Sequence, residues 1–225
     1  MTTTTVIFDL FNTLVDLISY DKTDAISMAK RAYFQHVPDD VFCSLFSRYE
    51  TERVNTRSIT LEECPYTAQM RYVAENTGTD LEGELEEMER SMFSGFIRTE
   101  LGKDTVDVLD YLHGKGYRLA VCSNSRFSSA CLRGLLDGYG ILDRFEAVIS
   151  STDTGHRKPS PLMYSDVCSK LKISPGEACF VGDDFVKDAD GPRSFGMDAV
   201  HYLRDGSRRR DGKTVTSLSQ LKQIL

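Results

Sequence analysis

From about residue 98 onward the sequence alternates between short apolar runs and longer segments with helical periodicity, and this alternation constrains the fold more than any other feature. Short runs rich in β-branched and aromatic residues are typical of buried strands, and helices between them indicate βαβ units in a parallel sheet. We therefore predict an α/β fold. The predicted strands cover 6–9, 117–122, 145–149, 178–181 and 199–203, and the predicted helices of this part lie at 106–112, 127–139, 161–171 and 217–225.

A long segment, residues 19–97, lacks strand signals and shows helical periodicity instead. The helices predicted within it begin at Pro38, at the capping-box pattern Thr60 to Glu63, and at Asp80, which suits an N-cap. A chain of 225 residues is long enough for one core with a large insertion. We therefore divide it into a core of residues 1–18 and 98–225 and a helical insertion of residues 19–97.

Composition narrows the classes of function. The 27 Lys and Arg against 34 Asp and Glu give a net charge of −7, which does not favour nucleic-acid binding. The basic run Arg208 to Arg210 fits a solvated loop. No apolar stretch approaches the roughly 20 residues that span a bilayer, and the N-terminus lacks the features of a signal peptide. The six cysteines show no C-x-x-C spacing, so we expect free thiols and a cytoplasmic protein without nucleic-acid or membrane partners.

The first predicted strand ends in an acid, Asp9, followed by the turn 10–13. The carboxyl ends of parallel strands form the edge where open α/β sheets bind ligands. Taken alone, Asp9 also fits a simple turn residue. The position two residues later, where a second carboxylate would supply a proton carrier, holds Phe11.

Polar residues also follow the other predicted strands. Ser123 and Asn124 could offer a hydroxyl, an amide and helix N-terminal N–H groups to an anion, although such residues also serve as N-caps. Lys158 stands before Pro159, which fixes the backbone. Asp183, Asp184 and Asp188 cluster after another strand. Packed acids repel each other unless a cation is present, and oxygen ligands of this kind suit Mg²⁺.

These four segments resemble, in order and spacing, the four motifs of the haloacid dehalogenase-like (HAD) hydrolase superfamily. The motifs here are Asp9-Leu10-Phe11-Asn12-Thr13, Ser123-Asn124, Arg157-Lys158-Pro159 and Gly182-Asp183 with Asp188. The resemblance implies a Rossmann-like parallel sheet core, with the insertion forming the helical cap of the C1 subgroup. It further implies a small-molecule substrate and the following roles: Asp9, Ser123 and Lys158 as catalytic residues; Asn12, Thr13 and Asn124 as substrate-binding residues; and Asp9, the Phe11 carbonyl, Asp183 and Asp188 as ligands of Mg²⁺.

Phe11 divides the expected function. Phosphatases of the superfamily usually carry an Asp there as general acid and base, and such help is typically worth roughly 10²–10⁴-fold. The sequence therefore predicts slow Mg²⁺-dependent hydrolysis of a small phosphorylated metabolite. Two alternatives stay open. A 2-haloacid dehalogenase has an aromatic residue at this place, because halide leaves without a proton, and a catalytically weak protein could serve as a binding or regulatory module.

The residues themselves favour the phosphatase over the dehalogenase. Without a cation, Asp183 and Asp184 would raise the pKa of Asp9 and weaken a nucleophile that must be ionised. A phosphonate-cleaving enzyme would need a Schiff-base lysine in the cap, and neither Lys22 nor Lys30 has a signature for it. Some cap residues could recognise an anionic substrate, but charges on helices are more often a solvated face and name no substrate. These residues are Arg48, Arg53, Arg57 and Arg71.

Overall fold

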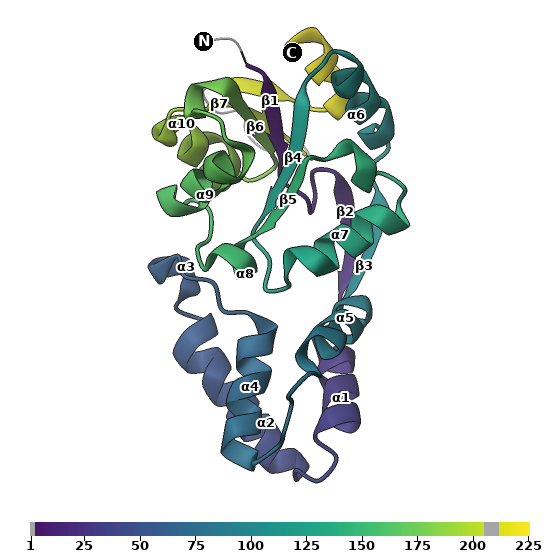
Figure 1. The fold of residues 1–225 in the computed structure, drawn as a ribbon, viewed down its shortest axis with the longest axis vertical. Helices are drawn as coiled ribbons and strands as arrows, with labels where there is room; N and C mark the ends of the chain where they lie inside the picture. The colour runs from purple at the N-terminus through teal and green to yellow at the C-terminus, as the bar shows by residue number, and fades with distance from the viewer. Residues whose placement is uncertain (1–2, 205–211) are drawn as a thin grey trace.

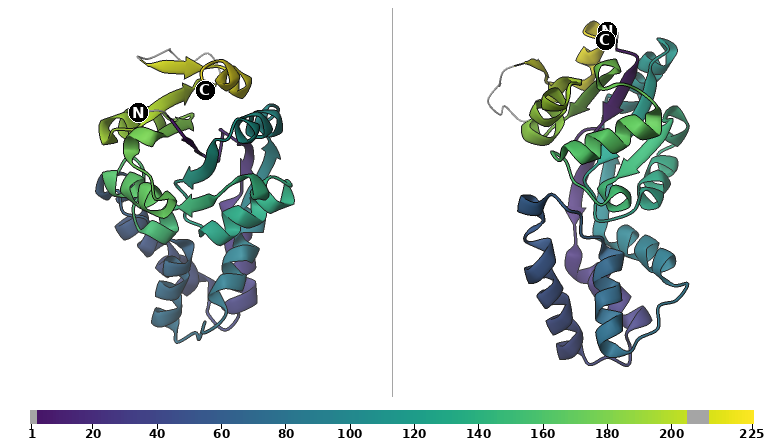
Figure 2. Two further views of the ribbon diagram at one scale, coloured as in Figure 1. Left: turned by 45° about the horizontal axis from the view of Figure 1, so that its top comes forward. Right: turned by 60° about the vertical axis from the view of Figure 1, so that its left-hand side comes forward.

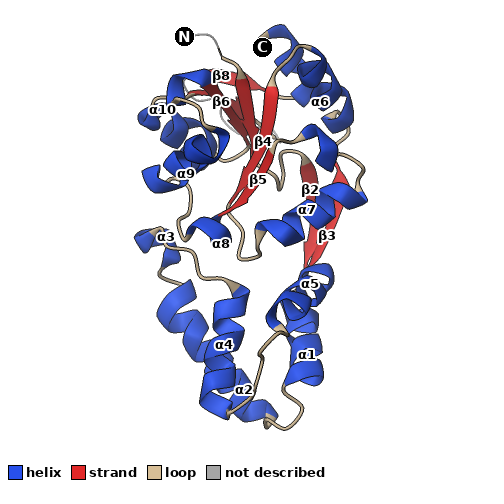
Figure 3. Cartoon of the chain, viewed as in Figure 1, coloured by secondary structure: helices blue, strands red, loops and turns tan. Residues whose placement is uncertain are grey.

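A six-stranded sheet forms the centre of the protein in the computed structural model, which describes residues 3–204 and 212–225 (Figure 1, Figure 3). The order is β5-β4-β1-β6-β7-β8, and every neighbouring pair is parallel. The strands are β1 (Thr5–Phe8), β4 (Arg118–Ser123), β5 (Ala147–Ser150), β6 (Ala178–Gly182), β7 (Asp198–Tyr202) and β8 (Lys213–Val215). The predicted α/β fold and its five strands are confirmed, and β8 was missed because three residues carry too short a pattern.

Both faces of the sheet are covered by helices, which is why its strands read as continuous apolar runs. In β1, Val6 and Phe8 belong to one hydrophobic cluster and Ile7 to the other, and all three are fully buried. The first cluster receives side chains from α6 (Thr105–Gly114), α7 (Ser129–Gly138) and the 3₁₀ helix η5 (Leu218–Gln223), whereas α9 (Pro161–Leu171) covers the second. The helix predicted at 217–225 is thus a 3₁₀ helix, and those at 106–112, 127–139 and 161–171 are confirmed.

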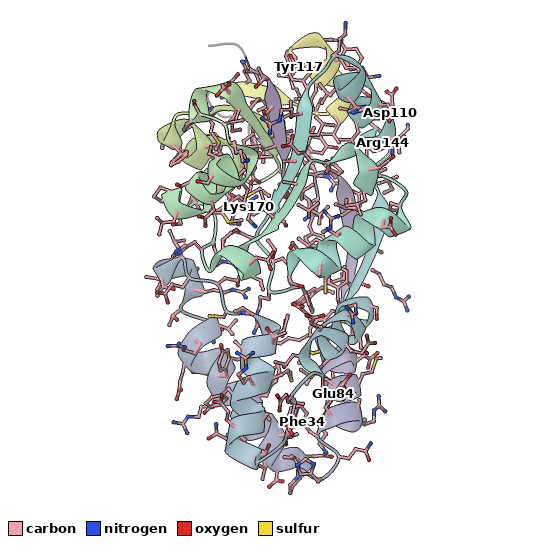
Figure 4. All side chains as sticks on the ribbon, in the orientation of Figure 1. Phe34, Glu84, Asp110, Tyr117, Arg144 and Lys170 are labelled. Atoms are coloured by element: carbon pink, nitrogen blue, oxygen red, sulfur yellow. The ribbon has the colours of Figure 1, made fainter. Side chains whose placement is uncertain are left out.

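The helices of residues 22–96, here called the helical block, lie at one end of the molecule, and both termini lie at the other (Figure 1, Figure 2). Phe34 in the block and Tyr117 near the termini mark these ends in Figure 4. The block contains α1 (Lys22–Tyr33), α2 (Asp39–Tyr49), the π-helix η1 (Glu50–Val54), α3 (Arg57–Thr60), α4 (Tyr66–Thr77) and α5 (Leu85–Phe96). The helix predicted from Pro38 is confirmed, and it buries Phe42 and Phe46.

Two helix starts predicted for the block are wrong. Thr60 ends α3 instead of opening a helix, because Leu61 adopts a left-handed conformation with φ 58° and α4 begins only at Tyr66. Asp80 does not cap α5, which begins at Leu85. Its carboxylate instead accepts a hydrogen bond from the Glu82 N–H at 2.9 Å and so closes a local turn.

A pair of antiparallel strands that the sequence analysis did not predict joins the block to the sheet. These are β2 (Val15–Tyr20) and β3 (Ile97–Leu101), paired from Val15 opposite Leu101 to Tyr20 opposite Ile97. Apart from the buried Val15, their residues are half-buried or exposed and mixed in polarity, so they lack the apolar run of a core strand.

Smaller core helices complete the structure. They are η2 (Leu142–Arg144), α8 (Ser151–Thr154), η3 (Pro175–Glu177), the π-helix η4 (Phe185–Asp190) and α10 (Gly191–Phe195). In η2, Arg144 reaches Asp110 of α6, with 2.6 Å between Nε and Oδ1 (Figure 4). Throughout 3–204 and 212–225, no helix combines the length and apolarity that a membrane crossing requires. The predicted basic loop Arg208 to Arg210 lies outside the described residues. All six cysteines are free thiols, as predicted.

Candidate active site

Asp9 stands directly after the central strand β1, and its backbone N–H donates to the Val181 carbonyl of β6 at 2.9 Å. The residue is 8% exposed. The turn that follows folds back on itself, since the Leu10 carbonyl accepts from the N–H groups of Thr13, Leu14 and Val15. This places the Thr13 hydroxyl 3.5 Å from Asp9 Oδ2.

Asn12 shapes this turn. It adopts a left-handed backbone conformation, with φ 61°, which Asn tolerates better than most residues. Its Oδ1 accepts from the Leu17 N–H at 3.3 Å, and its own N–H donates to the Val15 carbonyl at 2.6 Å. The side chain predicted to bind substrate is therefore engaged in holding the turn.

Lys158 is buried at the centre of the site. Its Nζ donates to Asp9 Oδ1 at 2.8 Å, to Asp188 Oδ1 at 2.7 Å and to the Cys122 carbonyl at 2.9 Å. Burial alone would lower the pKa of Lys158, but the charges of Asp188 and Asp9 outweigh it and raise that pKa well above its ordinary value. Lys158 therefore remains an ammonium ion and clamps two carboxylates.

Asn124 holds the backbone of Lys158 on both sides. Its Nδ2 donates to the Lys158 carbonyl at 2.9 Å, and its Oδ1 accepts from the Lys158 N–H at 2.8 Å. The amide predicted to bind substrate thus fixes the position of the lysine. Ser123, the other predicted residue of this segment, ends β4 and is 1% exposed.

Asp188 packs against a glycine that the site requires. A Cβ atom on Gly182 would lie 2.5 Å from the Asp188 carboxylate, so a larger residue would displace this acid. Asp188 Oδ2 accepts from the Asp184 N–H at 3.1 Å, while Oδ1 faces Lys158. Both oxygens of Asp188 are therefore already hydrogen-bonded.

Three carboxylates lie close together at the carboxyl ends of the strands, and Lys158 is the cation beside them. Oxygen atoms of Asp9, Asp183 and Asp188 lie within 4.8 Å of one another. Lys158 pairs with Asp9 and Asp188, whereas none of the ion pairs among residues 3–204 and 212–225 involves Asp183. Burial and the Asp9 charge raise the pKa of Asp183 to about 6. This excess of buried negative charge and its oxygen donors fit a divalent cation such as Mg²⁺. We call Asp9, Lys158, Asp183 and Asp188 the acid-rich centre.

A pocket of about 270 Å³ opens beside Phe11, between the sheet and the helical block. Its lining comes from both parts of the molecule: Phe11, Leu17, Tyr20, Arg57, Ile97, Asn124, Ser125, Arg126, Phe127 and Arg157. Phe127 also joins the two parts, because its ring packs on the block residues Tyr66 and Phe93 with centroids 4.9 and 5.0 Å apart. Phe11 therefore forms part of a pocket wall.

The three arginines of this pocket differ in their partners. Arg126 is satisfied, since it donates to the Cys64 carbonyl, to Glu50 Oε1 and to Gln69 Oε1 and lies 3.7 Å from the Tyr66 ring centroid. The sequence analysis assigned no role to Arg126, which lies two residues after the motif Ser123-Asn124, or to Arg157, which belongs to the motif of Lys158. Of the four cap arginines considered, Arg57 lines this pocket, and Arg48 pairs with Glu52 on the surface.

The backbone also connects the helical block to the core loop that carries Lys158. The Glu63 N–H donates to the Gly155 carbonyl at 2.9 Å, and the Arg157 N–H donates to the Leu61 carbonyl at 2.8 Å. Between them, Glu62 and His156 form an antiparallel bridge. The carboxyl ends of β4 and β5 face the block (Figure 3). The structure therefore has the block closed over the strand ends.

Comparison with known proteins agrees with the motifs. The family model of haloacid dehalogenase-like hydrolases matches residues 3–196. The chain belongs to the haloacid dehalogenase-like hydrolase family. Within this family, ribulose-1,5-bisphosphate 5-phosphatase of Halopiger xanaduensis is 26% identical over 216 residues, which cover 92% of this chain and 87% of that protein.

Other relatives of this HAD family member are matched over shorter regions. Haloacid dehalogenase-like hydrolase domain-containing protein 3 of Homo sapiens is 35% identical over 91 residues, which are 40% of this chain and 35% of that protein. (S)-2-haloacid dehalogenase 1 of a Pseudomonas species is 30% identical over 127 residues, 54% of this chain and 55% of the relative. These alignments span about a third and about half of the two relatives.

Solved structures share the fold along the whole chain. A dehalogenase with an intermediate complex superimposes with a TM-score of 0.65 at 20% identity, covering 100% of this chain and 97% of the other. A HAD phosphatase from Thermococcus onnurineus gives a TM-score of 0.57 at 24% identity, with the same coverage of both chains. The HAD fold is thus shared with phosphatases and dehalogenases alike.

Proposed function

We propose that this HAD hydrolase is a Mg²⁺-dependent phosphatase that hydrolyses a small phosphorylated metabolite with Asp9 as the nucleophile. The observation that carries the proposal is the acid-rich centre, where three carboxylates have oxygens within 4.8 Å of one another and one buried lysine pairs with only two of them. A dehalogenase acting without a metal would have no use for the unpaired charge of Asp183, whereas a phosphatase does.

In the proposed reaction, a carboxylate oxygen of Asp9 attacks phosphorus, and the bond between phosphorus and the leaving oxygen breaks. The product is an acyl phosphate on Asp9, and water then hydrolyses it to phosphate and regenerates the carboxylate. Lys158 holds the nucleophile through its 2.8 Å contact and offsets the charge of two approaching anions. Ser123 and Thr13 would supply hydroxyl groups to the phosphoryl oxygens.

The residues proposed to hold Mg²⁺ are Asp9, Asp183, Asp188 and the Phe11 carbonyl. Bound there, Mg²⁺ would supply positive charge to the phosphoryl oxygens. Because Asp188 already accepts bonds from Lys158 and the Asp184 N–H, its part in the proposal is mainly to contribute negative charge and to hold the lysine. The Asp183 carboxylate makes no ion pair with another described residue. It is therefore the principal protein ligand in this proposal.

Phe11 carries no proton, so the leaving oxygen must take its proton from water. We infer a slow enzyme, or one that prefers substrates with good leaving groups, since general acid help is typically worth roughly 10²–10⁴-fold. The long alignment with a relative named as a phosphatase supports this assignment. Residues 19–97 would act as the cap that excludes bulk water, and a cytoplasmic location stays a prediction.

The test is hydrolysis of a panel of small phosphate esters, with Mg²⁺ and with a chelator. We expect phosphate release that needs the metal and that rises as the leaving group becomes more acidic. Turnover that is independent of metal would contradict the proposal. Absence of phosphate release, combined with chloride release from 2-chloropropionate, would also overturn it.

A second candidate is a carbon–halogen hydrolase. The observation in its favour is that Phe11 presents an aromatic wall to the pocket beside the nucleophile, where halide could leave without a proton. The similarity to a relative named (S)-2-haloacid dehalogenase 1 also supports this candidate. The chloride measurement above decides between the two. A third candidate, a catalytically weak binding or regulatory protein, would show neither activity.

A further inference from the structure

Arg57 has a guanidinium nitrogen that is buried without a hydrogen-bond acceptor. Its Nη1 belongs to the few buried polar side-chain atoms of the described residues that lack a partner. The nearest carboxylate oxygen given for it, Glu63 Oε1, lies 3.8 Å away, which is too long for a hydrogen bond. A buried donor left unsatisfied costs free energy, so its presence requires an explanation.

Glu63 does not hydrogen-bond Arg57, because other donors hold its carboxylate in place. Oε2 accepts from Arg157 Nη1 and from Ser151 Oγ, both at 2.5 Å, and Oε1 accepts from the Cys64 N–H at 2.9 Å. The Glu63 side chain is 0% exposed, and its partners come from both sides of the junction between block and core. Glu63 is therefore held in place and does not move toward Arg57 without losing these bonds.

Positive charge exceeds negative charge at this point of the pocket. Arg57 and Arg157 share the single carboxylate of Glu63, and we call these three residues the base-rich centre. Burial lowers the pKa of Arg57, and the neighbouring charge of Arg157 lowers it further, as expected for cations that lack a full complement of anions. Arg126 pairs with Glu50, which Lys22 also contacts, and the charge of Arg126 likewise lowers the pKa of Arg57.

The base-rich centre lies within reach of the nucleophile loop through one continuous pocket. Arg57 and Arg157 line the same space of about 270 Å³ as Phe11, which is two residues from Asp9. Ligand pockets for drug-sized molecules are commonly about 300–1,000 Å³, so this one suits a compact metabolite. A molecule in this pocket would contact the arginines at one side and Phe11, on the loop that carries Asp9, at the other.

We propose that Arg57, together with Arg157, binds a second anionic group of the substrate, a carboxylate or a phosphate, separate from the group that reacts at Asp9. The substrate class is then small metabolites with an anion at each end. Guanidinium groups bind both anions through paired N–H donors. The inference rests on the proposed function only for the identity of the reacting group, since the second anion is recognised whatever Asp9 attacks.

Binding of non-hydrolysable ligands tests this without requiring turnover. The probes are phosphonoacetate, 3-phosphonopropionate and 4-phosphonobutyrate, each compared by calorimetric titration of the full chain with the amide in which a neutral carboxamide replaces the carboxylate. The three lengths allow for the span between the two ends of the pocket. We expect at least one acid to bind about 10–100-fold more tightly than its amide, as hydrogen bonds to charged groups imply. Bisphosphonates of matching length show whether phosphate is preferred to carboxylate.

Arg57→Gln should abolish the preference for the acid over its amide and leave the affinity for the amide within about twofold. Arg48→Gln is the matched control, because it removes the same charge from an exposed arginine of the same block, whose side chain is 64% exposed. The inference is overturned if no acid binds better than its amide, or if Arg57→Gln weakens acid and amide equally.

Turnover separates this inference from the proposed function. If the acids bind selectively through Arg57 but no phosphate ester is hydrolysed, the proposed phosphatase fails and the second-anion site stands. If phosphate esters are hydrolysed in a Mg²⁺-dependent way but Arg57→Gln lowers kcat/KM equally for esters with and without a second anionic group, the phosphatase stands and the second-anion site fails.

Discussion

The acid-rich and base-rich centres are both clusters of buried and half-buried charges, but the net charge of the two clusters has opposite sign. At the strand ends, three carboxylates lie close together, and one lysine pairs with two of them. At the junction with the helical block, two guanidinium groups share one carboxylate. Uncompensated buried charge is costly, so each centre favours a ligand that supplies what it lacks. One centre therefore suits a metal cation and the other an anion, and Phe11 lies on the pocket between them.

Removing the nucleophile is the strongest way to separate the two centres. We expect Asp9→Asn to lower kcat/KM for phosphate esters by roughly 10⁴-fold or more, because a carboxamide cannot form the acyl phosphate. Binding of the phosphonates at the arginines should persist. Steady-state phosphate release measures the loss, and Asp143→Asn, on the exposed side of the core, is the control. Retained activity would show that Asp9 is not the nucleophile.

Replacing Phe11, between the two centres, with a residue that can carry a proton should raise phosphatase activity. We expect Phe11→Asp to increase kcat for phosphate esters by roughly 10²-fold, and up to 10⁴-fold, because the missing general acid is restored. Phe11→Leu serves as control, since it changes the pocket wall without adding a proton. A gain in both variants would mean that the size of the wall matters, and no gain in Phe11→Asp would favour the dehalogenase or the binding protein.

Neutralising one carboxylate in each centre compares their imbalance directly. We expect Glu63→Gln to lower the free energy of unfolding by about 3 kcal/mol, because it leaves two half-buried arginines without the carboxylate that they share. Asp188→Asn should cost about 1 kcal/mol, because Lys158 keeps Asp9 and the repulsion among the acids falls. Urea unfolding in the presence of a chelator measures both. An equal loss in the two variants would contradict opposite imbalances.

A smaller effect is expected in the pH dependence of the metal-free protein. The pKa of Asp183 is raised from 3.8 to about 6, so the folded state holds this proton more tightly than the unfolded state. Stability should therefore fall as the pH rises from about 4 to about 6. Asp183→Asn should reduce this slope in urea unfolding with a chelator, and Mg²⁺ should stabilise the wild type mainly at the upper end of the range. A slope that is unchanged in Asp183→Asn would rule out this carboxyl as its source.

The sheet and the acid-rich centre could be predicted because both depend on local patterns with a fixed spatial outcome. Buried parallel strands read as apolar runs, and the residues after them meet at one edge of the sheet. Asp9, Lys158, Asp183 and Asp188 converge for this reason. The roles of the neighbouring amides could not be predicted from the sequence. Only the structure shows that Asn124 fixes the Lys158 backbone and that Asn12 holds its own turn.

The base-rich centre could not be predicted in the same way. Glu63 and Arg157 lie 94 positions apart, and no periodicity links polar residues on opposite sides of a junction. The capping-box prediction even assigned Glu63 to a helix start, because the motif gives no warning of the left-handed backbone at Leu61. Similarly, β2 and β3 lack an apolar run. Local sequence thus gave the elements of the core but not the contacts between core and block.

Arg157 and Lys158 are neighbours on one loop, yet the first belongs to the base-rich centre and the second to the acid-rich centre. Consecutive Cα atoms are about 3.8 Å apart, and Asn124 fastens the Lys158 peptide on both sides. This loop therefore fixes the distance between Lys158, beside the nucleophile, and Arg157, which is proposed to hold the far end of the substrate. The distance between the two anionic groups of a metabolite, as much as their charge, would then decide whether it is accepted. Lengthening or shortening this loop should change the preferred substrate length in the same direction.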